Sequence, residues 1–161
     1  MAAIDLYLSL GSNLGDRRRN IRDAVNALEK AFGKRSTACS QLIETAPWGE
    51  GPTAPFLNAC ARWHLDRAAD LSAQAHAILA ACQAVERSLG RPPHPLFDAQ
   101  GKRIYRDRPI DIDILFLGAE TIESETLTIP HPLIARRDFV RIPLREIAKP
   151  ALKRAFPDLF D

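Results

Sequence analysis

The chain has 161 residues, of which 46% are hydrophobic and 26% are charged, and this composition predicts one globular domain, residues 1–161, with its own hydrophobic core. The 22 basic and 20 acidic residues leave a net charge of +2, which is too balanced to predict binding to nucleic acid or to a membrane. No stretch approaches the roughly 18 apolar residues of a membrane-spanning helix. We expect a cytoplasmic protein with no leader segment.

The three cysteines are Cys39, Cys60 and Cys82. Their odd number, wide spacing and apolar surroundings predict buried thiols rather than disulfides or a zinc site. A reducing compartment such as the cytoplasm fits this pattern.

The first element is a strand over residues 4–10, where apolar and polar side chains alternate. It ends in a turn over residues 11–16 (GSNLGD). Asp16 then caps a helix that ends at Gly33. The glycine-containing turn matches neither a P-loop nor a dinucleotide fingerprint, so it either holds phosphate or serves only as a turn.

A second strand is predicted over residues 37–45, followed by a loop rich in proline and glycine over residues 46–55. Trp48 in this loop is either a lid or stacking platform, or a plug that folds back onto the core. The next strand, residues 56–65, places Phe56 and Asn58 on the same face.

An amphipathic helix is predicted from Asp70 to Gly90, because its apolar residues step by three and four. Gln83 and Glu86 lie one turn apart and off the apolar stripe. Residues 91–109 follow as an irregular segment with four prolines and five basic residues. Loops of this length in compact domains are functional or disordered.

The strand that follows, residues 108–116 (RPIDIDILF), carries two carboxylates. Since alternate side chains point to opposite faces, its isoleucines enter the core while Asp111 and Asp113 share the other face, about 6.6 Å apart. That spacing suits Mg²⁺, which is held by one or two carboxylates plus substrate phosphates. The alternative is a solvated sheet face on which arginines of the preceding loop act as counterions.

Short strands are predicted around residues 121–122 and 127–129, then a break at residues 130–132 (PHP) and a short helix over residues 142–147. The order strand, helix, strand, strand, helix, strand predicts an α+β protein with a ferredoxin-like sandwich. In that fold the antiparallel sheet carries both helices on one face. The additional short strands and helix lie at the C-terminal end.

Six motifs occur in one order that resembles a known family. They are residues 8–15 (LSLGSNLG), 44–49 (ETAPWG), 56–59 (FLNA), 86–91 (ERSLGR), 111–113 (DID) and 127–133 (LTIPHPL). The chain resembles 6-hydroxymethyl-7,8-dihydropterin pyrophosphokinase, an enzyme of folate biosynthesis, from about residue 4 to residue 147. The resemblance implies transfer of the β,γ-pyrophosphoryl group of ATP to the pterin hydroxymethyl group, with release of AMP.

The resemblance also implies roles for individual residues. Asp111 and Asp113 would bind two Mg²⁺ ions, and the basic residues of the catalytic loops would be Arg91 and Arg108. The residues at nucleotide-contacting positions are Gln83, Glu86, Thr128, His131 and Arg137. The residues at pterin-pocket positions are Thr45, Pro47, Trp48, Phe56, Asn58, Tyr105 and Phe139. The implied partners are the two small-molecule substrates, with a monomeric protein and no nucleic-acid or membrane partner.

Each of these residues also has a structural alternative. Gln83 and Glu86 fit a solvated helix edge, His131 fits a turn, and an arginine is by default a surface charge. The chain departs from the family just before the acidic strand, where residues 106–109 (RDRP) replace the common Gly-Pro-Arg.

Two other functions stay open at this stage. A ferredoxin-like sheet with paired carboxylates also resembles the palm of polymerases and nucleotidyl cyclases. An RNA-recognition sheet is the non-catalytic alternative, although the aromatic strand signature of such modules is absent.

Overall fold

The computed structural model describes residues 2–47, 54–92, 96–104 and 106–160. Its centre is a five-stranded sheet in which every strand pair is antiparallel. The long strands are β1 (Ala3–Ser12), β4 (Phe56–Asp66) and β7 (Asp111–Leu117), with β1 in the middle. The outer side of β4 pairs with two short strands, β2 (Ala38–Cys39) and β3 (Ile43–Thr45).

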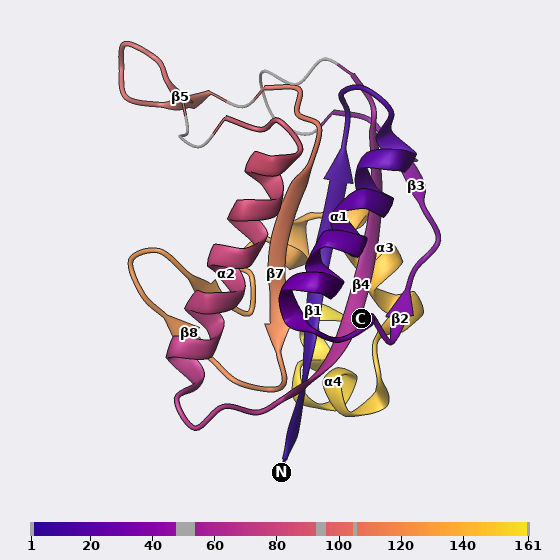
Figure 1. Ribbon diagram of the computed structural model, residues 1–161, viewed down its shortest axis with the longest axis vertical. Coiled ribbons are helices and arrows are strands. Elements are labelled where there is room, and N and C mark those ends of the chain that lie inside the picture. Colours follow the sequence, from indigo (N-terminus) through magenta and orange to yellow (C-terminus); the bar gives the residue numbers. More distant parts are fainter. Residues whose placement is uncertain (1, 48–53, 93–95, 105, 161) are drawn as a thin grey trace.

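One face of the sheet is covered by α1 (Arg17–Phe32) and α2 (Leu71–Ser88), which lie side by side in Figure 1. The main core lies between these helices and the sheet, and it contains Leu6, Leu8 and Leu10 of β1. Both helices begin at the predicted caps, because Asp16 and Asp70 accept hydrogen bonds from backbone N–H groups in the first turn. The described chain is therefore a mixed α/β protein with an antiparallel sheet.

The opposite face of the sheet is only partly covered. Near the start of β1, α3 (Asp138–Ile147) and α4 (Pro150–Ala155) pack on this face around buried Tyr7 and Phe116. The short connecting helices are η1 (Ile134–Arg136) and η2 (Pro157–Leu159). Towards the end of β1 the same face is left for polar side chains.

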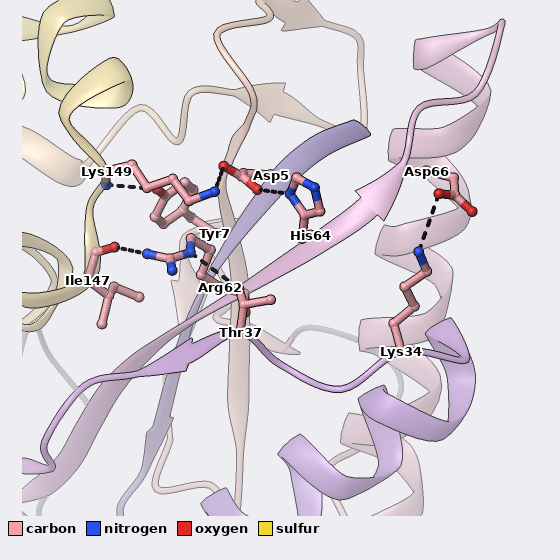
Figure 2. Close-up of polar contacts among 9 residues, drawn as sticks. All are labelled: Asp5, Tyr7, Lys34, Thr37, Arg62, His64, Asp66, Ile147 and Lys149. Atoms are coloured by element: carbon pink, nitrogen blue, oxygen red, sulfur yellow. Dashed lines mark hydrogen bonds and ion pairs between the residues drawn. The ribbon is translucent and has the colours of Figure 1, made fainter. Parts of the chain in front are cut away.

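A set of polar contacts ties the segment between α3 and α4 to the sheet (Figure 2). Asp5 accepts from the Lys149 ammonium at 2.9 Å and contacts His64 Nδ1 at 2.7 Å. The Lys149 N–H donates to the Tyr7 hydroxyl, and Arg62 donates to the Ile147 carbonyl. We call Asp5, Tyr7, Arg62, His64, Ile147 and Lys149 the anchor cluster.

The predicted second strand is interrupted, and this corrects the prediction for one cysteine. Ser40 separates β2 from β3, and its hydroxyl accepts the Cys60 N–H at 2.9 Å in place of a backbone carbonyl. Cys39 is therefore at the edge of the sheet and exposed, whereas Cys60 and Cys82 are buried as expected. All three thiols are free.

The irregular segment over residues 91–109 contains more structure than predicted, because it includes a small hairpin of β5 (Leu96–Phe97) and β6 (Arg103–Ile104). The two short strands predicted after the acidic strand are present as β8 (Ile122–Glu123) and β9 (Thr128–Ile129), which pair with each other. Helix α3 begins four residues before the predicted start. Within the described ranges, no helix has both the length and the apolar character needed to cross a bilayer.

Candidate active site

A cavity of about 260 Å³ lies on the partly covered face of the sheet. It contains an acidic pair, several arginines and two aromatic rings. The lining residues are Ser9, Gly11, Thr45, Ala46, Phe56, Asn58, Arg91, Arg103, Arg108, Asp111, Asp113, His131, Pro132, Leu133, Arg137 and Phe139.

Strand register brings the floor of the cavity together. Ser9 is opposite Asp113, and Gly11 lies between Asp111 on one neighbouring strand and Asn58 on the other. Gly11 matters because a Cβ atom at this position would lie 2.8 Å from Asn58 Oδ1. The absence of a side chain at residue 11 therefore leaves the Asn58 amide in place, where it donates to the Thr45 hydroxyl at 2.7 Å.

Asp111 is held by arginines. Arg91 donates to Asp111 at 2.7 Å and to Glu86 at 2.6 Å, and Glu86 also accepts the backbone N–H of Ile112 at 2.9 Å. Burial disfavours the charged form of Asp111, but the charges of Arg108 and Arg91 hold the pKa of this carboxyl below its ordinary value. Asp111 is therefore an anion at neutral pH.

Asp113 has weaker support from the protein. Its nearest cationic partner is Arg137 at 3.6 Å, and His131 Nε2 is 3.9 Å away. Burial and the negative charge of Asp111 raise the pKa of Asp113 to about 7. The two carboxylates therefore differ in support, because Asp111 contacts Arg91 at 2.7 Å whereas the ion pair of Asp113 is longer.

His131 is a neutral hydrogen-bond donor in this setting. The N–H of Leu133 donates to His131 Nδ1 at 3.1 Å, so the ring proton of the neutral imidazole is on Nε2, which faces Asp113. Burial and the charge of Arg137 lower the pKa of His131 to about 4. Nε2–H can therefore donate to an anionic oxygen without itself carrying charge.

The opposite part of the cavity is aromatic. Phe56 is buried on β4, and Phe139 comes from the first turn of α3. The Arg108 guanidinium lies 5.6 Å from the centre of the Phe56 ring, and that of Arg137 lies at the same distance from the Phe139 ring. Two rings and one positioned amide suit a flat heterocycle with polar edges.

One buried residue beside the cavity had no role in the sequence interpretation beyond the turn. Asn13 is 3% exposed and bonds to two loops that are far apart in sequence. Its amide donates to Asp107 Oδ1 at 2.8 Å and to the Ala54 carbonyl at 3.0 Å, and its Oδ1 accepts the Arg108 N–H at 2.7 Å. Only its position in the GSNLG turn hinted at such a role.

The structure brings most of the predicted site residues to this cavity. Those that line it are Thr45, Phe56, Asn58, Arg91, Arg108, Asp111, Asp113, His131, Arg137 and Phe139. Glu86 stands behind Arg91, while Gln83 and Thr128 are exposed outside the lining, as part of α2 and β9. Pro47 is half-buried next to Ala46. Trp48 and Tyr105 lie outside the described residues.

The sequence interpretation assigned no site role to several lining residues. They are Ser9, Gly11, Ala46, Pro132 and Leu133, whereas Arg103, which also lines the cavity, was among the arginines considered as counterions of the acidic pair. Alternation along the first strand places Ser9 and Gly11 on the face away from the leucines, which was the available signal.

The acidic pair has the donor chemistry of a Mg²⁺ site. Mg²⁺ takes oxygen ligands, keeps several waters and is commonly bound through one or two carboxylates and substrate phosphates. Among the described residues, no group of three or more His, Cys, Asp or Glu side chains is placed to hold a metal. Asp111 and Asp113 therefore fit a cation that a phosphate ligand helps to hold, and the raised pKa of Asp113 shows what that cation would relieve.

Comparison with known proteins identifies similar sequences. The profile of the 7,8-dihydro-6-hydroxymethylpterin-pyrophosphokinase (HPPK) family matches residues 7–149. A 2-amino-4-hydroxy-6-hydroxymethyldihydropteridine pyrophosphokinase of Porphyromonas gingivalis is 42% identical over 89% of this chain and 90% of its own length. A protein of the same name from Bacillus subtilis is 34% identical, covering 92% of this chain and 81% of its own length.

Longer proteins are also similar. The mitochondrial folate synthesis bifunctional protein of Pisum sativum is 36% identical over 92% of this chain, which spans 26% of that protein. A crystal structure of HPPK-DHPS in complex with substrates superimposes with a TM-score of 0.63 at 12% identity. It covers 97% of this chain, and the chain spans 43% of it. At this identity the likeness concerns the fold alone.

Proposed function

This chain belongs to the 7,8-dihydro-6-hydroxymethylpterin-pyrophosphokinase family, and from this we propose that it transfers the β,γ-pyrophosphoryl group of ATP to 6-hydroxymethyl-7,8-dihydropterin. The products are AMP and the pterin pyrophosphate, in a step of folate biosynthesis. The observation that carries the proposal is one cavity that combines an aromatic, amide-bearing part, several arginines and the acidic pair Asp111 and Asp113.

We assign the aromatic part to the pterin. Phe56 and Phe139 would stack on the ring, and Asn58, oriented by its bond to Thr45, would read the polar edge. Both rings lie under arginines in the ligand-free protein, so the arginines must move aside when the ring enters. We include Pro47, Trp48 and Tyr105 in this pocket on the strength of the sequence motifs.

We assign the arginine-rich part to the triphosphate. Arg91, Arg103, Arg108 and Arg137 all line the cavity, and arginine suits phosphate oxygens because its guanidinium donates in a planar fork. His131 adds a neutral donor through Nε2. Gln83, Glu86 and Thr128 would contact the nucleotide from the edge of the site.

We propose that Asp111 and Asp113 hold two Mg²⁺ ions together with the ATP phosphates. When bound, these ions would neutralise phosphate charge and orient the chain of phosphates. The two carboxylates are adjacent on one strand face and unequal in charge support. Asp113, whose ion pair with Arg137 is 3.6 Å long, would gain the more from a bound cation, because that cation would offset the repulsion from Asp111.

The residues of the chain then act by positioning and by electrostatics. The hydroxyl oxygen of the pterin forms a bond to the β-phosphorus, the bond between that phosphorus and the oxygen of the leaving AMP breaks, and the hydroxyl proton is released to water. Arg91 and Arg108 stand where negative charge spreads over the phosphate oxygens, and donors fixed beforehand stabilise such charge well. The pterin pocket supplies proximity by holding the hydroxymethyl group near the acidic pair.

We also propose a ferredoxin-like classification for the sheet and its two helices. Two observations support it. The elements follow one another along the chain as β1, α1, β2 with β3, β4, α2 and β7, and the strands lie in the sheet in the order β2, β4, β1, β7. In this proposal, residues 1–161 form one monomeric cytoplasmic pyrophosphokinase domain, extended by the short strands and α3 at the C-terminal end.

The test is incubation of the purified protein with ATP, Mg²⁺ and 6-hydroxymethyl-7,8-dihydropterin. We expect AMP and pterin pyrophosphate in equal amounts. Release of pyrophosphate, as in polymerases and cyclases, or of ADP would contradict the reaction. Omission of the pterin is the control, and it should suppress AMP formation.

A further inference from the structure

The link between the two loops at the rim of the cavity runs through Asp107. A single oxygen, Oδ1, accepts the Asn13 side-chain amide at 2.8 Å and the Ala54 backbone N–H at 3.3 Å. Ala54 ends the loop that leads into Phe56, while Asp107 precedes Arg108. The carboxylate therefore joins the segment that leads into Phe56 to the segment that carries Arg108.

Asn13 completes the link from below. It is almost fully buried, and both its backbone and its side chain bond to Arg108: the Asn13 N–H donates to the Arg108 carbonyl at 3.1 Å, and Asn13 Oδ1 accepts the Arg108 N–H at 2.7 Å. The backbone of Arg108 is thus held on both sides, just next to Asp107. A guanidinium that emerges from a fixed backbone loses less entropy when it binds.

These contacts fix the position of Arg108. Its guanidinium lines the cavity over the Phe56 ring and is the leading positive charge that lowers the pKa of Asp111. A shift of its backbone would move the guanidinium relative to both the ring and the acidic pair.

We infer that Asp107 is a positioning residue for the reaction: its carboxylate, bonded to Asn13 and Ala54, fixes the backbone that carries Arg108. The inference rests on the proposed function.

Three variants separate this role from general damage. Asp107→Ala removes the acceptor of both hydrogen bonds, whereas Asp107→Asn keeps one acceptor oxygen while it loses the charge and replaces the second oxygen with an NH2 group. The matched control is Asp98→Ala in the same loop, since one oxygen of Asp98 also accepts two N–H groups, but from Gln100 and Lys102 within its own hairpin rather than from a second loop. We expect Asp107→Ala to lower kcat about tenfold, because small misplacements of catalytic groups are costly.

We expect Asp107→Asn and Asp98→Ala to retain kcat within about twofold, since the first keeps the acceptor and the second lies outside the link. If Asp107 acts through Arg108, the double variant Asp107→Ala/Arg108→Ala should have a kcat less than about twofold below that of Arg108→Ala alone. Three results would overturn the inference. In the first, the kcat losses of Asp107→Ala and Arg108→Ala multiply in the double variant. In the second, Asp107→Ala keeps the kcat of the unmodified protein, and in the third, Asp107→Asn lowers kcat as much as Asp107→Ala does.

A second readout needs no turnover. In the ligand-free protein, Asp107→Ala should speed hydrogen exchange at the amides of Ala54 and Arg108, while Asp98→Ala should leave both rates unchanged. Unchanged rates in Asp107→Ala would overturn the link itself. If the unmodified protein forms no AMP, the proposed function fails while the exchange result still decides whether the link exists.

Discussion

One face of the sheet packs against α1 and α2, and the other face carries aspartates at both of its ends. The aspartates at the two ends have different neighbours. In the anchor cluster, Asp5 lies 2.9 Å from the Lys149 ammonium and 2.7 Å from His64 (Figure 2). Although burial opposes ionisation, these partners hold the pKa of Asp5 below its ordinary value. In the cavity, burial and Asp111 raise the pKa of Asp113 to about 7.

The difference separates a structural carboxylate from a ligand-binding one. The anchor cluster takes its cations from the chain, so it is complete without a ligand and stabilises the contact of α3 and α4 with the sheet. In the acidic pair, Asp113 has only a 3.6 Å ion pair with Arg137 and lies beside the negative charge of Asp111. A cation brought with a polyphosphate would relieve the repulsion between the two carboxylates.

The largest effect is expected at the acidic pair. Asp111→Ala and Asp113→Ala should each lower kcat/KM by at least about 10³-fold, because each would weaken the binding of the cations proposed to stabilise developing negative charge, and loss of such stabilisation costs on this order. The melting temperature should change little, because both side chains face the cavity rather than the core. Steady-state kinetics and thermal unfolding, measured on the same preparations, provide the check. A melting temperature that falls in step with activity would contradict this assignment.

A smaller effect is expected at the cavity floor. Gly11→Ala places a Cβ atom 2.8 Å from Asn58 Oδ1, so the amide must turn away from its bond to Thr45. We expect about tenfold weaker pterin binding, which corresponds to about 1.4 kcal/mol. Affinity for a non-hydrolysable ATP analogue should stay unchanged. Calorimetric titration of each ligand separates the two, and equal losses for both would place Gly11 outside the pterin pocket.

The pH dependence of stability sharpens the comparison within the cavity. The pKa of Asp113 is raised to about 7, so between pH 4 and 7 the folded state binds more protons and its stability falls as pH rises. The pKa of His131 is lowered to about 4, so between pH 4 and 6.5 the unfolded state binds more protons and stability rises with pH. The two contributions oppose each other over nearly the same range.

Substitution of either Asp113 or His131 should therefore reveal the contribution of the other to the pH dependence of stability. Asp113→Asn should make the free energy of unfolding rise more steeply from pH 4.5 to 6.5, and His131→Gln should make it fall. The Asp113 side chain is 31% exposed, so solvent screens part of the repulsion and we expect changes of about 1–2 kcal/mol. Urea unfolding at both pH values measures the slopes, and slopes of the same sign in the two variants would contradict the assignment.

The smallest effect is expected in the anchor cluster. Asp5→Asn should lower the free energy of unfolding by about 1 kcal/mol at pH 7, since it weakens contacts with the partly exposed side chains of Lys149 and His64. Because the pKa of Asp5 is lowered on folding, this loss should disappear as pH falls below about 4. kcat should remain that of the unmodified protein. A drop in kcat would show that the anchor cluster and the cavity are coupled.

The local elements and the acidic pair followed from the sequence because their signals are local. Strict alternation placed the isoleucines of β7 in the core and Asp111 and Asp113 on the other face. Helical spacing and the caps Asp16 and Asp70 delimited α1 and α2. The six motifs led to the family, and with it to most of the residues that line the cavity.

What remained hidden depended on contacts between distant segments. The strand breaks after Cys39, where the Ser40 hydroxyl rather than a backbone carbonyl accepts the Cys60 N–H. No pattern in residues 37–45 predicts this break. Likewise, the sequence places Asn13 in a turn, but only folding brings it to Asp107 and Arg108, which are 94 and 95 residues away. The unequal charge states of Asp111 and Asp113 are decided in the same way.

Periodicity and capping act within a few residues, so the chain by itself determined its strands, its two long helices and the face that carries the acidic pair. Register between strands, burial and the approach of loops act across the whole molecule. Only the tertiary structure therefore decided which arginines support Asp111, why the pKa of Asp113 is raised, and how Asp107 joins two distant segments beside the cavity.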